Sequence, residues 1–435
     1  MVRYAYFSKE GVYVKYLWRG MLAAAVLLVT GCGSLEDPNA GIVGSGEKVI
    51  SLSAEQVKKG LIEKGLVDES TTVYGYDAYK ITYTTTDEEG EPVEASGLMT
   101  VPTGMPEAVT EQIGFSIVSD DHGTIFADRE APTFKAEHTN TEVDTPIIFS
   151  ALAGFVTLQP DYIGFGDSSE HYHPYLLKNS LANATVDFIK AAKKFAEDNG
   201  IKLNGQLFVT GYSEGGYAAM AALQKIEKEG ELHVTMAAPM AGPYAMSGMA
   251  IKVLEAPQIG VPSFMANVGY AYALASNKEV DTVINAPYAS QLENLLGGDY
   301  NRTQIDGELT HKTTGESGLF RQDFVNSFFQ GAITGQPDWF LGALLQNDVY
   351  RWKATTPIRL VQCMGDDVVP FAMSQIAEGN MTEMGTGDIS IVPVEIAIMK
   401  NPNTPLRLGH GTCGAAAYKV AAGLFAKERN ANIGY

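Results

Sequence analysis

Ser213 lies among glycines, in Gly211-Tyr212-Ser213-Glu214-Gly215-Gly216, where a strand pattern gives way to a helix pattern. The four apolar or β-branched residues before Gly211 are typical of a short buried strand, and the alanine-rich run after Gly216 is typical of a helix. A serine hydroxyl becomes a nucleophile when a sharp, strained turn holds it beside a base and amide donors. Glycines on both sides let the helix pack closely against neighbouring strands. This context predicts a nucleophilic Ser213, and an ordinary Gly/Ser turn is the alternative.

Apolar runs alternate with helix patterns along most of the chain. Such alternation predicts an α/β fold with a mostly parallel central sheet and helices on both faces. Ahead of it, residues 79–84 and 95–102 predict an antiparallel pair joined by a turn at 87–90, and residues 53–66 predict a helix capped by Ser53. The expected parallel strands are residues 113–118, 155–160, 207–210, 234–239, 358–363 and 391–396, and the expected helices are residues 179–198, 217–229 and 415–427.

The long stretch between residues 239 and 358 shows no strand periodicity and is rich in Met, Phe and Leu. We expect a large helical cap inserted into the α/β domain, at about residues 245–352. Apolar residues of these types are usually buried, so most of them are expected to form the core of the cap rather than to contact a substrate.

The beginning of the chain carries an export pattern. Residues 21–29 are nine apolar residues preceded by four basic ones. A membrane-spanning helix needs about 20 apolar residues, whereas a basic segment before a short apolar run is typical of a secretory signal. The run ends in Leu28-Val29-Thr30-Gly31-Cys32, which resembles a bacterial lipobox.

That resemblance implies a lipoprotein signal peptide at residues 1–31 and a lipid on Cys32. A plain signal peptide with an incidental cysteine is the alternative. Gly33, in place of an aspartate, favours retention in the outer membrane of the cell envelope. We expect a flexible tether at residues 32–50, since this segment is rich in Gly, Ser, Asp and Asn, and a folded domain at residues 51–435.

The chain is acidic, with a formal charge of −20, and the signal carries three net positive charges, so its removal leaves −23. A protein of this charge offers no electrostatic footprint for nucleic acid or for an anionic lipid surface. The expected contact with a membrane is therefore the lipid on Cys32.

Of the three cysteines, Cys363 and Cys413 remain once Cys32 is assigned to the lipid. An even number in an oxidising compartment favours a disulfide, and two free buried thiols are the alternative. A bridge across a loop of this length would contribute up to about 4 kcal/mol by chain entropy.

Several motifs together resemble an α/β-hydrolase, closest to the secretory lipase group with a large cap. They are the glycine-flanked serine, the turn Asp161-Tyr-Ile-Gly-Phe-Gly-Asp167, the hairpin with Ala95-Ser-Gly97 and Val101-Pro102, the loop Gly365-Asp-Asp-Val-Val-Pro370 and the segment Leu408-Gly-His-Gly-Thr412. The resemblance covers about residues 72–430. It implies the chain order serine, acid, histidine for a catalytic triad.

His410 is the base by this order, because the other six histidines precede the strand expected at 358–363. Asp366 follows that strand and is the expected acid, with Asp367 as the alternative. One oxyanion donor is expected to be the backbone N–H of Glu214, and the other that of Gly123 or Thr124.

Two carboxylates on the same loop, Asp120 and Asp121, would oppose a developing negative charge, so we expect them to point outward or to bind His122. The pair His171 and His173 lacks a further ligand at a suitable spacing, so no metal site is predicted. No cofactor is expected.

The sequence thus predicts an exported serine hydrolase of carboxylic esters, acting on hydrophobic acyl groups through an acyl-enzyme. Two other classes stay open: a serine peptidase of the same superfamily, and a binding lipoprotein that has lost catalysis. A peptidase of this kind is expected to carry an N-terminal propeller, for which the sequence before Ser213 has no room.

Overall fold

The computed structural model describes residues 45–63, 66–138, 147–398 and 407–433. The predicted signal peptide, Cys32 and most of the predicted tether lie outside these residues. In the described part of the chain one sheet has the strand order β1-β2-β3-β5-β4-β6-β7-β8-β9. These strands are β1 Ser45–Leu52, β2 Gly75–Thr86, β3 Pro92–Thr103, β4 Phe115–Asp121, β5 Val156–Pro160, β6 Leu203–Tyr212, β7 Met236–Met240, β8 Ile358–Gln362 and β9 Ile389–Pro393.

The sheet is antiparallel at one edge and parallel over the rest. β1, β2, β3 and β5 pair antiparallel in that order, whereas β5, β4, β6, β7, β8 and β9 pair parallel. Every residue of β4, β5 and β7 is buried. Strands covered on both faces read as continuous apolar runs, which is why the parallel region was visible in the sequence.

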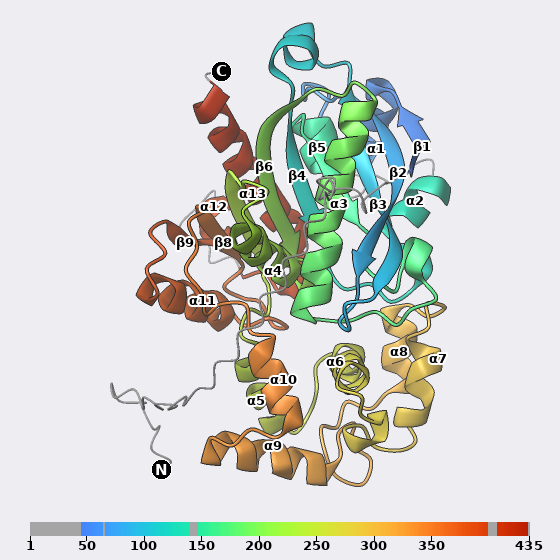
Figure 1. Ribbon diagram of the computed structural model, residues 1–435, viewed down its shortest axis with the longest axis vertical. Helices are drawn as coiled ribbons and strands as arrows, with labels where there is room; N and C mark the ends of the chain where they lie inside the picture. The colour runs from blue at the N-terminus through green and yellow to red at the C-terminus, as the bar shows by residue number, and fades with distance from the viewer. Residues whose placement is uncertain (1–44, 64–65, 139–146, 399–406, 434–435) are drawn as a thin grey trace, which may run out of the picture. The chain divides into compact units, whose positions relative to one another are not determined.

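Helices cover both faces of this sheet (Figure 1). α3 (Lys178–Asp198) and α4 (Glu214–Glu229) share one apolar core with Ile117, Leu207 and Val209. α13 (His410–Ile433) packs on the opposite face against their strand neighbours Val118 and Phe208. Successive strand residues point to opposite faces, so the two cores are separated by the sheet itself. This arrangement confirms the predicted α/β class.

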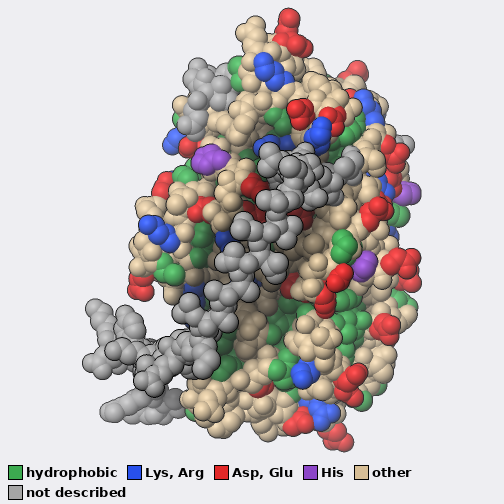
Figure 2. Space-filling view, in the orientation of Figure 1, with side chains coloured by type: hydrophobic (Ala, Val, Ile, Leu, Met, Phe, Trp, Pro, Cys, Tyr) green, Lys and Arg blue, Asp and Glu red, His purple; other side chains and the backbone are tan. Residues whose placement is uncertain are grey.

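The stretch between β7 and β8 is helical, as predicted, and its helices gather at one end of the sheet (Figure 1). Figure 2 shows hydrophobic side chains among the surface residues of this region, while Asp and Glu side chains are spread over the whole visible face. The helices are α5 Met246–Glu255, α6 Pro262–Ala275, α7 Leu292–Leu295, α8 Arg302–Glu308, α9 Gln322–Thr334 and α10 Trp339–Gln346.

Three predicted elements differ from the structure. Residues 45–50 of the expected tether belong to β1, because the edge of β2 offers free backbone groups and Asp77 binds the ammonium of Lys48 at 2.6 Å. The strand expected at 391–396 ends at Pro393, where α12 (Val394–Ile398) begins.

The third difference is the last helix, which begins at His410 rather than near residue 415. Asp367 caps it, since its Oδ1 accepts the backbone N–H of His410 at 2.9 Å. The predicted helix at 53–66 is observed as α1, Ala54–Glu63.

Candidate active site

Ser213 lies on a strained turn between β6 and α4. Its φ is +61° and its ψ −119°, a region that side-chain-bearing residues rarely adopt. The turn is possible because its neighbours are glycines: a Cβ on Gly215 or Gly211 would overlap the carbonyl oxygen of Asp121, and one on Gly216 would overlap that of Met240. The local sequence therefore produces the sharp, strained turn that the glycine pattern predicted for a nucleophilic serine.

The base and the acid come from two loops far away in the chain. His410 Nε2 is 2.9 Å from Ser213 Oγ, and His410 Nδ1 is 2.8 Å from Asp366 Oδ2. The side chain of Asp366 is fully buried, and its other carboxyl oxygen accepts the N–H groups of Val368 and Val369 at 3.0 and 2.8 Å. The structure brings the three predicted triad residues into the order serine, imidazole, carboxylate.

Asp367, the alternative acid, binds the backbone of His410 rather than its ring. It bonds the backbone N–H of His410, and this hydrogen bond lowers the pKa of its carboxyl group. The hydroxyl of Tyr212 donates to the carbonyl oxygen of His410 at 2.7 Å, which adds a contact from β6. Asp366 orients the ring of His410, whereas Asp367 and Tyr212 hold its backbone.

Two further contacts tie the acid loop to the histidine loop. Cys363 and Cys413 form the predicted disulfide, with their Cα atoms 6.1 Å apart. Glu395, which is fully buried, accepts the N–H of Met364 at 2.8 Å, that of Gly365 at 3.2 Å and that of Leu408 at 3.3 Å. The sequence reasoning missed Glu395, although a single carboxylate within the apolar run 391–396 was a signal for a buried polar contact.

Gly123 and Thr124 line the same cavity as Ser213 and His410. This cavity has a volume of about 340 Å³. The Thr124 hydroxyl is 3.0 Å from that of Tyr175. The assignment of Gly123 or Thr124 as the donor stays a prediction.

The expectation for Asp120 and Asp121 was wrong, since both are fully buried and neither binds His122. Asp120 accepts the amide of Gln159 at 2.9 Å and Asp121 accepts the hydroxyl of Thr185 at 2.9 Å. Burial raises the pKa of Asp121 well above its usual range, which favours the neutral form of this carboxyl group.

A second cavity beside Ser213 is apolar and lies under the cap. It joins a third cavity of 210 Å³ through shared lining residues. Ser213 does not line the third cavity, whose lining includes the exposed Lys252 and Gln258, so the path leads from the nucleophile toward the surface. The shared residues are Met249, Val253, Phe264, Met265 and Val368.

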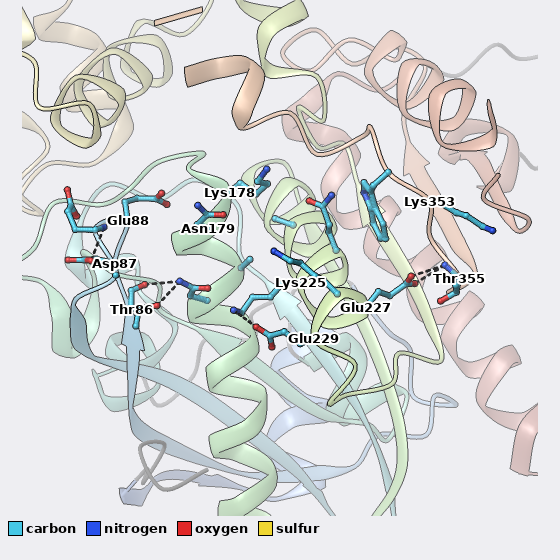
Figure 3. A pocket seen from close by; sticks show the side chains of 18 residues that line it. Thr86, Asp87, Glu88, Lys178, Asn179, Lys225, Glu227, Glu229, Lys353 and Thr355 are labelled. Carbon is cyan, nitrogen blue, oxygen red and sulfur yellow. Dashed lines mark hydrogen bonds and ion pairs between the residues drawn. The ribbon is translucent and has the colours of Figure 1, made fainter. Parts of the chain in front are cut away.

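A larger groove of 890 Å³ lies between the β2–β3 turn, α3, α4 and residues 352–355, and no triad residue lines it (Figure 3). Several of its charged groups bind each other or backbone: Lys225 pairs with Glu229 at 2.5 Å, and Glu227 accepts the N–H of Thr355 (Figure 3). We assign it no chemistry.

Among the described residues, no cluster of three His, Cys, Asp or Glu side chains has the arrangement of a metal site. His171 is exposed, and His173 bonds Glu214 instead. None of the helices in the described part of the chain is both long enough and apolar enough to span a membrane.

Known proteins share this architecture. A sequence model of the prolyl oligopeptidase family matches residues 141–234, which include β5, α3, β6 and α4. No curated protein sequence matches the chain.

Solved structures match over nearly the whole chain. A protein from Legionella pneumophila has a TM-score of 0.74 at 23% identity and covers 89% of this chain and 98% of its own. The rice cell wall degrading esterase LipA from Xanthomonas oryzae has a TM-score of 0.72 at 22% identity, and the match covers 90% of this chain and 96% of the esterase. Candida antarctica lipase A in its closed state has a TM-score of 0.57 at 14% identity, and the match covers 89% of this chain and 86% of the lipase. The chain therefore has the α/β-hydrolase fold.

Proposed function

We propose that the protein is a serine hydrolase of carboxylic esters with hydrophobic acyl groups. The observation that carries the proposal is the chain of contacts from Ser213 Oγ through both nitrogens of His410 to the buried Asp366. A hydroxyl on a strained turn, with an imidazole that a carboxylate orients, is the arrangement used for acyl transfer.

The reaction follows from this geometry. His410 Nε2 takes the proton of Ser213 as Oγ bonds to the ester carbonyl carbon, and Asp366 stabilises the imidazolium. The N–H of Glu214 and that of Gly123 or Thr124 stabilise the oxyanion. His410 then gives the proton to the leaving alcohol and an acyl-enzyme remains. A water then bonds to the acyl carbon while His410 takes its proton, and His410 gives that proton to Ser213 Oγ as the acyl–oxygen bond breaks and the acid leaves.

The substrate class is inferred from the cavities. The apolar cavity beside Ser213 and the adjoining 210 Å³ cavity are lined mostly by apolar side chains, Met, Val and Phe among them. Burying one methylene group contributes about 0.8 kcal/mol, so an acyl chain lying along both cavities gains affinity with each carbon. We expect the long acyl chain, rather than the alcohol, to occupy this path.

Replacing Met249 by tryptophan tests this path. Met249 lines both apolar cavities, so the larger ring is expected to block the passage between them and to lower kcat/KM for decanoyl esters by at least about tenfold. The rate on acetyl esters is expected to change less than about twofold. Ile333→Trp is the matched control, because Ile333 is 82% exposed on α9 and lines neither cavity. Equal losses on both esters would contradict the assignment of the path.

A panel of nitrophenyl esters from acetyl to palmitoyl, run beside nitroanilides of the same acyl groups and of short peptides, tests the reaction class. We expect esters to be hydrolysed and the amides to be poor substrates. The match to the prolyl oligopeptidase family supports a peptidase as the second candidate. Faster cleavage of the peptides than of the esters would favour that candidate, and inactivity on both would favour a binding protein.

We also propose that the protein is held at the cell envelope, in the outer membrane, by a lipid on Cys32. The support is the apolar run at 21–29 followed by the lipobox-like residues. Cys32→Ala is expected to move the protein from the detergent-soluble membrane fraction to the aqueous fraction and to remove the lipid mass from its N-terminal peptide. An unlipidated wild-type peptide that retains a free Cys32 would contradict this proposal.

A further inference from the structure

A buried pair of titratable groups lies directly behind the nucleophile. The side chain of Glu214, the residue after Ser213, is 1% exposed, and its Oε1 is 2.6 Å from His173 Nε2. The His173 side chain is 7% exposed. Neither side chain belongs to the triad, yet Glu214 contributes the backbone N–H that is expected to bind the oxyanion.

The second nitrogen of His173 fixes where the protons are. His173 Nδ1 is 2.8 Å from the carbonyl oxygen of Ile163. A carbonyl oxygen only accepts hydrogen bonds, so Nδ1 carries a hydrogen. The short contact between Nε2 and Oε1 of Glu214 then holds one more proton, on the imidazole or on the carboxyl group. In either arrangement the pair has no net charge.

This neutrality matters because of the position of Glu214 in α4. Glu214 is the first residue of the helix, whose N-terminus carries a partial positive charge of about +0.5. That charge favours an oxyanion bound to Ser213. An unpaired carboxylate on the same residue would offset it, and a site that excludes water would strengthen the repulsion.

The other titratable groups around the pair do not supply a compensating charge. Burial lowers the pKa of His122, in the loop after β4, which favours its neutral form. Burial raises the pKa of Tyr162 and of Tyr175, so both phenols stay protonated. Asp121, at the end of β4, has a raised pKa for the same reason. Among the titratable side chains of the described residues near Glu214, His173 is the one hydrogen-bonded to its carboxylate.

The packing around His173 keeps its ring in place. The ring of Phe165 lies 4.9 Å from it, centroid to centroid, and that of Tyr162 lies 6.0 Å away. Gly164 has a φ of +93°, and a Cβ there would overlap the backbone of His173. The glycine-containing turn after β5 therefore permits the close approach that brings His173 to Glu214.

We propose that His173 is a positioning residue for the oxyanion hole: it neutralises Glu214 and fixes the side chain of the residue whose N–H binds the oxyanion. The proposal rests on the proposed function, in which Ser213 forms a tetrahedral intermediate. His173 acts through Glu214 and does not touch the substrate.

Three variants test the proposal by steady-state ester hydrolysis. His173→Gln can still donate a hydrogen bond to Glu214 but cannot supply the proton that neutralises the carboxylate, and it is expected to lower kcat about a hundredfold with KM within about twofold. Glu214→Gln is expected to cost at most about tenfold, because it removes the charge and keeps the shape. The double variant His173→Gln/Glu214→Gln is expected to be at least about tenfold faster than His173→Gln.

A second readout is inhibition by a trifluoromethyl ketone, which forms an oxyanion on a serine nucleophile. We expect His173→Gln to weaken it in proportion to kcat, while the affinity for the matching methyl ketone is unchanged. His171→Gln, at an exposed neighbouring histidine, is the control and should behave as wild type.

A double variant as slow as His173→Gln would overturn the proposal and leave His173 a packing role, as would wild-type kcat in His173→Gln itself. Failure of the proposed function gives a different result: the wild type would hydrolyse no ester in the panel.

Discussion

Replacing Ser213 by alanine is expected to lower kcat for ester hydrolysis by at least about a thousandfold, with little change in thermal stability. The side chain is the nucleophile of the proposed reaction, so no acyl-enzyme forms without it. The turn at residue 213 depends on the backbone and on the glycines around it. Alanine has a Cβ as serine does, so the substitution is expected to leave the positive φ at residue 213 unchanged. Initial rates on butyryl and decanoyl nitrophenyl esters measure the loss.

Ser290→Ala is the matched control, because Ser290 is an exposed serine whose hydroxyl donates only to the nearby carbonyl of Pro287. It should keep the wild-type rate. A Ser213→Ala protein that folds and hydrolyses esters at more than about a tenth of the wild-type rate would remove Ser213 from the mechanism.

Replacing Asp366 by asparagine is expected to lower kcat by roughly ten-thousandfold. The amide keeps the size of the carboxyl group but can donate to His410 Nδ1, which favours the tautomer in which Nε2 carries the hydrogen and cannot take the proton of Ser213. It also no longer stabilises the imidazolium. The loss should fall in kcat rather than in KM, because the side chain of Asp366 is fully buried beneath the histidine.

The neighbouring carboxylate provides the control within the same loop. Asp367 Oδ1 accepts the backbone N–H of His410, and the side-chain oxygen of asparagine can accept the same bond. Asp367→Asn is therefore expected to cost less than about tenfold. If Asp367→Asn had the larger effect, Asp367 would replace Asp366 as the acid.

The residues of the triad could be predicted because each lies in a short local pattern. Ser213 is flanked by glycines between a strand and a helix, Asp366 follows a buried strand, and His410 is the one histidine beyond it. The disulfide followed from the number of cysteines. These signals depend on chain order and on local backbone preference, which a single sequence contains.

The contacts that support the triad could not be predicted, because they join segments far apart in the chain. Glu395 binds backbone groups of two different loops, and His173 meets Glu214 across 41 residues. A polar residue within an apolar run indicates that its side chain needs a hydrogen-bond partner, but the sequence does not show which residue that partner is.

The same limit explains the wrong expectation for Asp120 and Asp121. Their charges were visible next to the predicted oxyanion loop, whereas the partners that bury them, Gln159 on β5 and Thr185 on α3, were not. The start of α13 was misplaced for a similar reason, since the cap of that helix is Asp367, 43 residues earlier.

Covalent labelling by a fluorophosphonate ester tests the central claim most directly, because it reads out an activated serine without a choice of substrate. Peptide mapping by mass spectrometry is expected to place the phosphonate on Ser213 alone, with about one label per molecule. Asp366→Asn should be labelled far more slowly, while Asp367→Asn is labelled at nearly the wild-type rate. Absence of a label on Ser213 in folded protein, or a label on another serine, would contradict the account.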